Sequence, residues 1–258
     1  MRFSNKSNRT VPFLFPKISR QRVPAISAEQ MAEVDRLMVE EYHIYLIQMM
    51  ENAGRNLARL ALVRFLENQP DKQKIAVLCG SGGNGGGALV SARHLSNYGA
   101  EITVCLSKGY DRFSGIALHQ LHILKAMGLE ICEGECLADR EFDLIIDGLI
   151  GYSLRGAPQG LIARMIEEAN RHPAEVLALD IPSGLQANNG HPMKPTIHAR
   201  ATMTLALPKK GLYAESARSA VGELFLADIS VPPGLYQRNF HRQVPDIFKQ
   251  GEIVQLSM

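Results

Sequence analysis

A strand, a glycine-rich segment and the start of a helix follow one another between Val77 and Val90, and this stretch constrains the fold more than any other. The apolar run over residues 75–79 is short and contains β-branched side chains, as is typical of a buried parallel strand. Six glycines lie within residues 80–87, and apolar residues at helical spacing then continue to about Asn97. A helix N-terminus presents free backbone N–H groups and the positive end of the helix dipole, which suits a phosphate group. Glycine also lets a ligand approach the backbone, because it has no Cβ.

The glycine pattern is not specific by itself. Residues 80–85 satisfy GxGxxG, but no lysine follows as it would in the phosphate loop GxxxxGK(S/T). The alternative is a tight strand-to-helix turn that needs glycine only for packing. Six glycines exceed what one turn needs, so we favour a binding segment.

The composition excludes several other classes of protein. A hydrophobic content of 46% and a charged content of 21% are ordinary for a globular chain. The formal net charge of +2 gives no argument for nucleic acid, and no apolar stretch approaches the length of a membrane span. Cys79 and Cys105 lie in strand-like runs and are expected to be reduced core residues. We interpret Cys132 and Cys136 as thiols, with metal ligation as the alternative, and expect a reducing, cytoplasmic location.

Residues 1–22 differ from the rest of the chain. They carry six Lys or Arg residues and no acidic residue, and two prolines interrupt any helix. We interpret them as a basic extension lying on the domain, with an organellar transit segment as the alternative. Residues 23–258 are expected to form a single domain.

The rest of the chain alternates between strand-like and helical patterns. A capping box at Ser27 and Gln30 predicts the start of the first helix. The alternation predicts a mainly parallel sheet with helices on both faces. The expected strands cover residues 75–79, 102–106, 144–147, 176–179, 202–207 and 223–227, and the expected helices cover residues 44–66, 88–97, 114–127 and 159–171.

Polar residues follow the ends of several of these strands. Lys108 follows the second strand, Asp147 ends the third, and Asp180 ends the fourth. Ligands bind at the carboxyl ends of parallel strands, near the point where the strand order reverses. Each Asp could instead cap a helix or turn. Because a desolvated carboxylate is costly without a partner, we favour a ligand or metal role.

Several ordered motifs together resemble the NAD(P)H-hydrate epimerase family, also known as the YjeF N-terminal domain. The resemblance runs from about Val23 to Tyr236. The motifs are MENAG (50–54), the glycine segment, ARHL (92–95), the segment from Asp147 to Gly156, DIPSG (180–184), LPKKGL (207–212) and VGELFLADISVPP (221–233).

This resemblance implies a Rossmann-like three-layer αβα sandwich over residues 23–258, and a homodimer. It implies an enzyme that interconverts the R and S epimers of hydrated NADH and NADPH. A potassium ion would be held by Asn84, Asp147 and Ser183, whose oxygen atoms suit a hard cation. The implied substrate-binding residues are Gly83, Asn84, Gly85, Gly86, Gly87, Gly151, Tyr152, Ser153, Leu154, Arg155, Gly156, Ala157 and Asp180.

A positioned carboxyl group is a plausible proton shuttle for this reaction. Protonating the departing hydroxyl group and then delivering water to the other face would invert the carbon. Asp180 is the expected shuttle, with Lys108 as its electrostatic partner. The kinase-like dehydratase domain that sometimes accompanies this domain is not found before Met258, so dehydration is expected to need a separate protein.

The sequence also departs from the family pattern. Gly83 and Gly87 stand where the family loop NNGGD has its first Asn and its Asp, Gln186 stands where an Asp is usual, and Tyr152 and Ser153 replace Thr-Gly. The alternative function is therefore a catalytically inactive nucleotide-binding or scaffold homologue.

Overall fold

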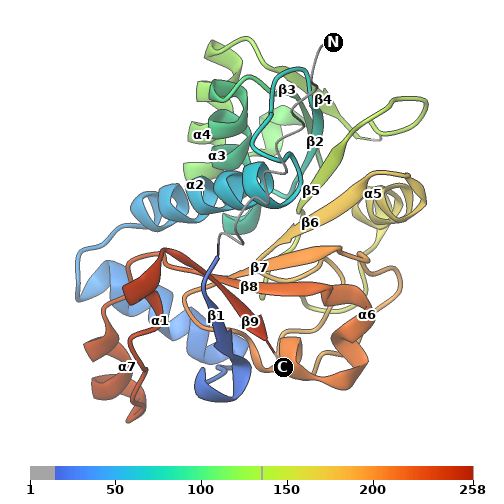
Figure 1. Cartoon of the computed structure of the whole chain (residues 1–258). Helices are drawn as coiled ribbons and strands as arrows, with labels where there is room; N and C mark the ends of the chain where they lie inside the picture. Colours follow the sequence, from blue (N-terminus) through green and yellow to red (C-terminus); the bar gives the residue numbers. More distant parts are fainter. Residues whose placement is uncertain (1–14, 135, 258) are drawn as a thin grey trace, which may run out of the picture.

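The computed structural model describes residues 15–134 and 136–257, and a sheet of nine strands runs through this part of the chain. The strand order is β1-β9-β8-β7-β6-β5-β2-β3-β4. Every pair of neighbouring strands is parallel except β8 and β9 (Figure 1). The strands are β1 (Lys17–Ser19), β2 (Lys74–Cys79), β3 (Glu101–Leu106), β4 (Glu130–Glu133), β5 (Leu144–Gly148), β6 (Glu175–Leu179), β7 (Ala201–Leu205), β8 (Glu223–Ala227) and β9 (Ile253–Ser257).

The helices form a layer on each face of the sheet, so the predicted three-layer α/β architecture is confirmed. Figure 1 shows α2, α3 and α4 on one side of the upper sheet and α5 on the other. One face of β2 packs its alternate residues Ile75, Val77 and Cys79 against the first group. The opposite residues, Ala76 and Leu78, share a core with α5. The longer helices are α1 (Ala28–Glu40), α2 (Leu46–Arg64), α3 (Gly83–Asn97), α4 (Gly115–Ala126), α5 (Gly160–Arg171) and α7 (Pro233–Phe240), and α6 (Arg218–Val221) is a single turn.

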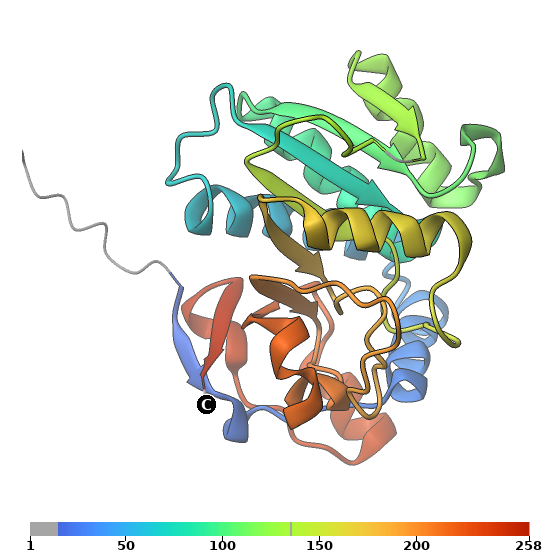
Figure 2. The same ribbon diagram turned by 90° about the vertical axis from the view of Figure 1, so that its right-hand side faces the viewer.

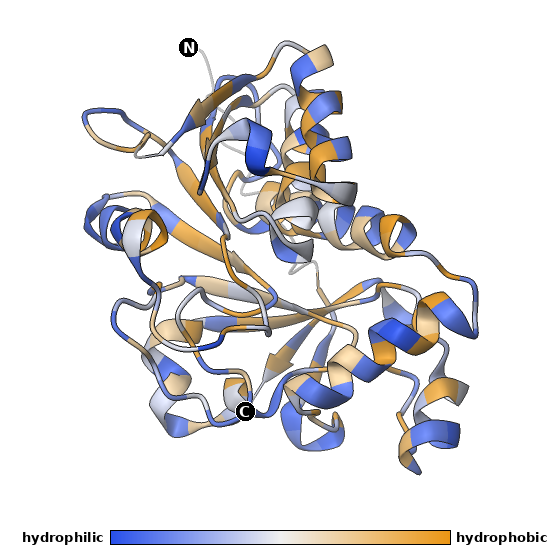
Figure 3. Cartoon of the chain, turned by 180° about the vertical axis from the view of Figure 1, so that it is seen from behind, coloured by the Kyte–Doolittle hydropathy of each residue, from blue (hydrophilic) through white to orange (hydrophobic). Residues whose placement is uncertain are grey.

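The distribution of hydropathy explains this arrangement. Figure 3 shows strands that are apolar through the middle of the molecule and helices with one apolar and one polar side.

Among the described residues, no helix has both the length and the hydropathy that a membrane crossing requires.

The first helix begins where its capping pattern predicts. The side chain of Ser27 accepts a hydrogen bond from the Gln30 backbone N–H at 3.2 Å. The Gln30 side chain accepts one from the Ser27 N–H at 3.0 Å. Met31, Val34 and Met38 of α1 are buried as their spacing predicts.

Helices α2 and α3 approach closely because their contact is built from small residues. A Cβ on Gly54 would lie 2.4 Å from the Val90 Cβ and 2.6 Å from the Gly87 carbonyl oxygen. The glycine of the MENAG motif is therefore explained by packing. Neighbouring Glu51 forms an ion pair with Arg93 and a hydrogen bond with His94 of α3.

The strand β1 forms one edge of the sheet, and its residues show little strand-like pattern in the sequence. Residues 1–14 of the basic segment lie outside the described residues, but Lys17–Ser19 form β1 beside β9, as the blue and red strands of Figure 2 show. Phe15 packs edge-to-face on Phe225, with ring centroids 5.7 Å apart. The folded domain therefore includes residues 15–22, which we assigned to an extension. Strands β1, β4 and β9 and helix α7 were not predicted.

Two of the four cysteines also differ from expectation. Cys79 and Cys105 are buried free thiols, as predicted. Cys132 and Cys136 form a disulfide, so their interpretation as thiols was wrong. They are brought together because Cys132 lies on β4, and the chain turns at Gly134 directly after this strand.

Candidate active site

A cavity of about 470 Å³ opens at the carboxyl ends of the central strands. It lies at the point where the strand order reverses, since β2 leads to β3 on one side and pairs with β5 on the other. Its wall contains residues at the carboxyl ends of five strands. Gly80 follows β2, Ser107 follows β3, Leu149 follows β5, Asp180 follows β6, and Leu205 is the last residue of β7. The helix residues Asp35, Met49 and Met50 and the loop residue Ile229 are also in the wall.

The glycine segment forms one wall of the cavity, but it is more helical than expected. Helix α3 already begins at Gly83, so Gly83–Gly87 form its first turns rather than an open loop. Close contacts explain two of the glycines: a Cβ on Gly80 would lie 1.9 Å from the Leu149 carbonyl oxygen, and one on Gly85 would lie 1.7 Å from that of Gly80. The first turn of a helix leaves backbone N–H groups without helical partners, which makes this wall suited to an anion.

Asp180 and Lys209 form an ion pair in the cavity wall. Lys209 Nζ bonds the Asp180 carboxylate, and it also donates to the Leu205 carbonyl oxygen at 3.1 Å. Thr204 Oγ1 donates to Asp180 Oδ1 at 3.3 Å. Asp180 has a φ of 66°, a left-handed backbone conformation that Asp tolerates better than most residues. The sequence predicted Asp180 but not Lys209, which was noted only within LPKKGL.

Asp35 of α1 is a second carboxyl group in this cavity, and the sequence pattern did not indicate its position there. The Tyr152 hydroxyl group donates a hydrogen bond to Asp35 Oδ2 at 2.5 Å. Burial raises the pKa of Asp35, although the hydrogen bond from Tyr152 and the charge of Lys209 oppose that rise. Lys209 Nζ lies 5.8 Å from the centre of the Tyr152 ring. The cavity therefore holds two carboxyl groups in different environments, one of them ion-paired and the other not.

Asp147 and Ser183 contact one another behind the cavity wall. Ser183 Oγ donates to Asp147 Oδ1 at 2.6 Å, and the Ser183 backbone N–H donates to Oδ2 at 2.8 Å. The Leu149 N–H donates to Oδ1 at 3.2 Å, and the Ile150 N–H donates to Ser183 Oγ at 2.8 Å. Burial raises the pKa of Asp147 to about 6 in spite of these bonds. Two of the three predicted cation ligands are thus adjacent.

Asn84, the third predicted cation ligand, lies beside Asp180. Both side chains face Gly151. A Cβ added to this glycine would lie 3.3 Å from Asn84 Cγ and also 3.3 Å from Asp180 Oδ2. The side-chain nitrogen of Asn84 is buried without a hydrogen-bond partner. A buried polar atom without a partner is rare, and it indicates a place where a ligand or ion belongs.

The cavity brings together part of the predicted substrate-binding set. Gly83, Asn84, Gly87, Gly151, Tyr152, Ser153 and Asp180 line it, and so does Lys108, whose amine lies 5.6 Å from the centre of the Phe113 ring. The wall does not include Gly85, Gly86, Leu154, Arg155, Gly156 or Ala157. Gly86 instead meets the Met50 side chain.

A sheet with helices on both faces and a cavity at the strand-order reversal defines a Rossmann-like α/β domain. The crystal structure of yeast ynu0 (YNL200c) has the same fold, with a TM-score of 0.77 and 22% identity over 91% of this chain and 100% of that one. The chain belongs to the family described as YjeF-related protein N-terminus, whose profile matches residues 46–211.

Relatives in this family carry names of enzymes. The chain is 37% identical over 243 residues to an NAD(P)H-hydrate epimerase of Dehalogenimonas lykanthroporepellens, covering 94% of this chain and 97% of the relative. It is 32% identical to an NAD(P)H-hydrate epimerase of Rhodopirellula baltica, covering 82% and 86%. It is 38% identical to a bifunctional NAD(P)H-hydrate repair enzyme Nnr of Moorella thermoacetica, but spans only 43% of that protein.

Proposed function

We propose that this protein is an NAD(P)H-hydrate epimerase that interconverts the R and S epimers of hydrated NADH and NADPH. Two relatives named for this activity match this chain over 97% and 86% of their own length. The observation that carries the proposal is the buried Asp180–Lys209 ion pair, which stands in the same cavity as the N-terminus of α3. The wall formed by the N-terminus of α3 suits the phosphates of a dinucleotide. The wall that contains Asp180 and Lys209 presents charged groups to the nicotinamide ring.

The two carboxyl groups have complementary roles in this proposal. Asp180 is ion-paired with Lys209, while burial favours the protonated form of Asp35. For the reaction, this hydrogen bond reverses: protonated Asp35 donates to the Tyr152 oxygen, and the Tyr152 hydroxyl group passes its own proton to the departing oxygen of the substrate. The carbon–oxygen bond then breaks, water leaves, and the ring nitrogen shares its electron pair with the carbon. The negative charge of Asp180 stabilises the resulting cation.

Epimerisation is completed by the reverse sequence on the other face of the ring. Water adds to the carbon, and the proton that it loses returns to the acid. The atoms of the substrate and product are the same, so no external reactant is consumed. Lys108 is the other cationic side chain that we place in this site, at the end of β3.

The residues around Asp147 fit a potassium ion. The donor set consists of the Asp147 carboxylate, the Ser183 hydroxyl group and the Asn84 amide. The oxygen and nitrogen of an Asn amide are assigned from their surroundings, so a rotated Asn84 would present its oxygen where the nitrogen now lacks a partner. Such an ion would supply positive charge that offsets the buried Asp147 carboxylate. The Ile150 N–H bond to Ser183 would then hold the segment before Gly151 in place.

The remaining expectations are also part of the proposal. We propose a homodimer, a cytoplasmic location, and a separate protein for dehydration of the same metabolite. The alternative, a nucleotide-binding homologue without turnover, is favoured by Gly83 and Gly87, which lack the side chains of the family pattern.

An epimerisation assay with purified protein and each hydrated cofactor distinguishes the two functions. An epimerase equilibrates a single epimer far faster than the uncatalysed reaction, and Asp180→Asn removes this acceleration. Saturable binding without any acceleration would establish the alternative.

A further inference from the structure

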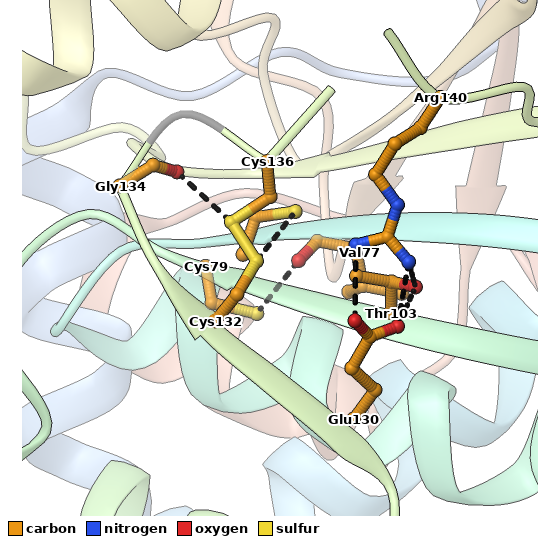
Figure 4. Close-up of a disulfide and its surroundings, with 9 residues drawn as sticks. Val77, Cys79, Thr103, Glu130, Cys132, Gly134, Cys136 and Arg140 are labelled. Carbon is orange, nitrogen blue, oxygen red and sulfur yellow. Dashed lines mark hydrogen bonds and ion pairs between the residues drawn. A yellow bond between two sulfur atoms is a disulfide. The ribbon is translucent and has the colours of Figure 1, made fainter. Parts of the chain in front are cut away.

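Three cysteines meet at the edge of the sheet away from the cavity. Cys105 on β3 is the direct neighbour of Cys132 on β4, and their sulfur atoms are 4.0 Å apart. Cys136, in the chain after β4, is bonded to Cys132 (Figure 4). The three sulfur atoms all lie within 4.8 Å of one another. We refer to Cys105, Cys132 and Cys136 as the cysteine cluster; none of them lines the cavity.

The surroundings of the cysteine cluster are apolar on one side and cationic on the other. Cys105 and Cys136 are buried, and Cys132 is half-buried. Figure 4 shows Arg140 next to the disulfide, held by Glu130 at 2.7 and 3.0 Å and by Thr103 at 3.3 Å. Burial raises the pKa of the Cys105 thiol to about 12, although the charge of Arg140 favours its thiolate. Solvent can reach the cluster through Cys132.

The spacing of the three sulfur atoms suits a metal ion that prefers sulfur ligands. Zinc–sulfur bonds are about 2.3 Å long, which places sulfur ligands of one ion roughly 4 Å apart. We propose that, once the Cys132–Cys136 disulfide is reduced, the cysteine cluster binds one thiophilic metal ion through its three sulfur atoms. Zinc is the probe of choice, because a dication leaves a net charge of only −1 on the three thiolates, and Arg140 stands nearby.

Reduction comes first because the two sulfur atoms of a disulfide are not thiolates. A dithiol reductant supplies both electrons: one of its sulfur atoms attacks the disulfide, and the other closes a cyclic disulfide on the reductant. Cys132 and Cys136 become thiols. Zinc then displaces the three thiol protons, so its binding releases protons and strengthens as the pH rises.

The test is a titration of the reduced full-length protein with Zn²⁺ in competition with a chromophoric chelator. Wild type is expected to bind one Zn²⁺ per chain. Cys105→Ala and Cys136→Ser are each expected to bind at least tenfold more weakly. Cys79→Ala is the matched control, because Cys79 is a buried free thiol that packs on the opposite face of the sheet, and it should bind like wild type. Unreduced wild type should bind none at this site.

Each other outcome overturns the proposal. If Cys105→Ala binds as tightly as wild type, the ion needs only Cys132 and Cys136. If Cys79→Ala loses binding equally, the loss reflects core packing. If unreduced wild type binds as tightly as the reduced protein, the cluster is not the site. Cys136→Ser keeps the test decisive should Cys105→Ala fail to fold, since Cys136 lies outside the strands.

Discussion

Lys209 and Asp180 form an ion pair in which both side chains are almost completely shielded from water, with exposures of 1% and 5%. Each residue follows the carboxyl end of a strand, Asp180 after β6 and Lys209 after the neighbouring β7. A buried charge without its partner is strongly destabilising, whereas a complete pair is tolerated. This pair is therefore a constraint on stability as well as on the proposed chemistry.

Replacing one partner of the pair should reduce both stability and activity. Lys209→Met leaves Asp180 buried without a cation, so we expect the free energy of unfolding to fall by about 3–5 kcal/mol. We also expect epimerisation to become undetectable, because Asp180 then loses the cation that holds its carboxylate in place. Urea unfolding and the epimerisation rate measure the two effects.

The double variant Asp180→Asn/Lys209→Met separates these effects. It should recover part of the stability lost by Lys209→Met, because no unpaired charge stays buried. It should recover no activity. A double variant with restored turnover would show that the pair is structural only.

Asp35→Asn should make the stability of the protein less dependent on pH. Because burial raises the pKa of Asp35 in the fold, its contribution to stability is complete below its unfolded pKa and is lost as the pH rises through the folded value. The variant does not titrate, so its stability relative to wild type should increase from pH 4 to pH 8. Unfolding in urea across this range is the measurement, and exposed Asp111, changed to Asn, is the charge control.

The same variant should also alter the pH profile of epimerisation. We expect wild-type turnover to decline as Asp35 loses its proton, and Asp35→Asn to be slow at every pH. Tyr152→Phe should lower the rate as well, because it removes the hydroxyl group through which we propose the proton passes. Wild-type turnover in Asp35→Asn would assign the acid to another group.

Potassium should stabilise the protein more than sodium at equal ionic strength. An ion that binds only the folded state at a concentration of 100 times its Kd adds about 2.7 kcal/mol. We expect a higher Tm in KCl than in NaCl for wild type, and no difference for Asn84→Ala or Ser183→Ala. Asn97→Ala, an exposed change on the same helix as Asn84, should retain the difference. Equal Tm values in both salts for wild type would argue against the site.

Gly87→Asp should raise the epimerisation rate by restoring an orienting carboxylate in the cavity. A tenfold gain corresponds to about 1.4 kcal/mol of transition-state stabilisation. A Cβ on Gly87 would lie 2.9 Å from Leu179 Cδ2, so some stability should be lost as the Leu179 side chain shifts. Gly87→Ala has the same packing change without the carboxylate. Equal rates in the two variants would mean that the carboxylate has no effect.

Much of the fold follows from local patterns. Apolar runs that alternate with helical patterns predict β2, β3, β5, β6, β7 and β8. Each of these strands is long enough for its apolar composition to be recognised in the sequence. The strands β1 and β4 contain only three and four residues, and their pairing partners lie elsewhere in the sequence. No local pattern identifies them, since their place is decided by the free edges of the completed sheet.

The site residues divide in the same way. Asp180 and Asn84 could be found because parallel strands bring their carboxyl ends together. Lys209 is 29 residues beyond Asp180, and only the pairing of β6 with β7 makes them neighbours. Asp35 looks like any acidic residue of an amphipathic helix until the fold places α1 against the cavity. The chemistry of such residues depends on burial, which a sequence pattern does not measure.

The position of β9 between β1 and β8 determines when the sheet can be finished. Ser19 is paired with Ser257, so the first described strand has no neighbour in the sheet until residues 253–257 have been synthesised. A growing chain on the ribosome can assemble β2 to β8 in turn, while β1 waits and its backbone groups stay hydrated. Such a distant pairing forms slowly, because the closing loop spans nearly the whole molecule. The addition of β9 thus joins β1 to the rest of the sheet, and a nascent chain that stalls before residue 253 has β8 as an open edge.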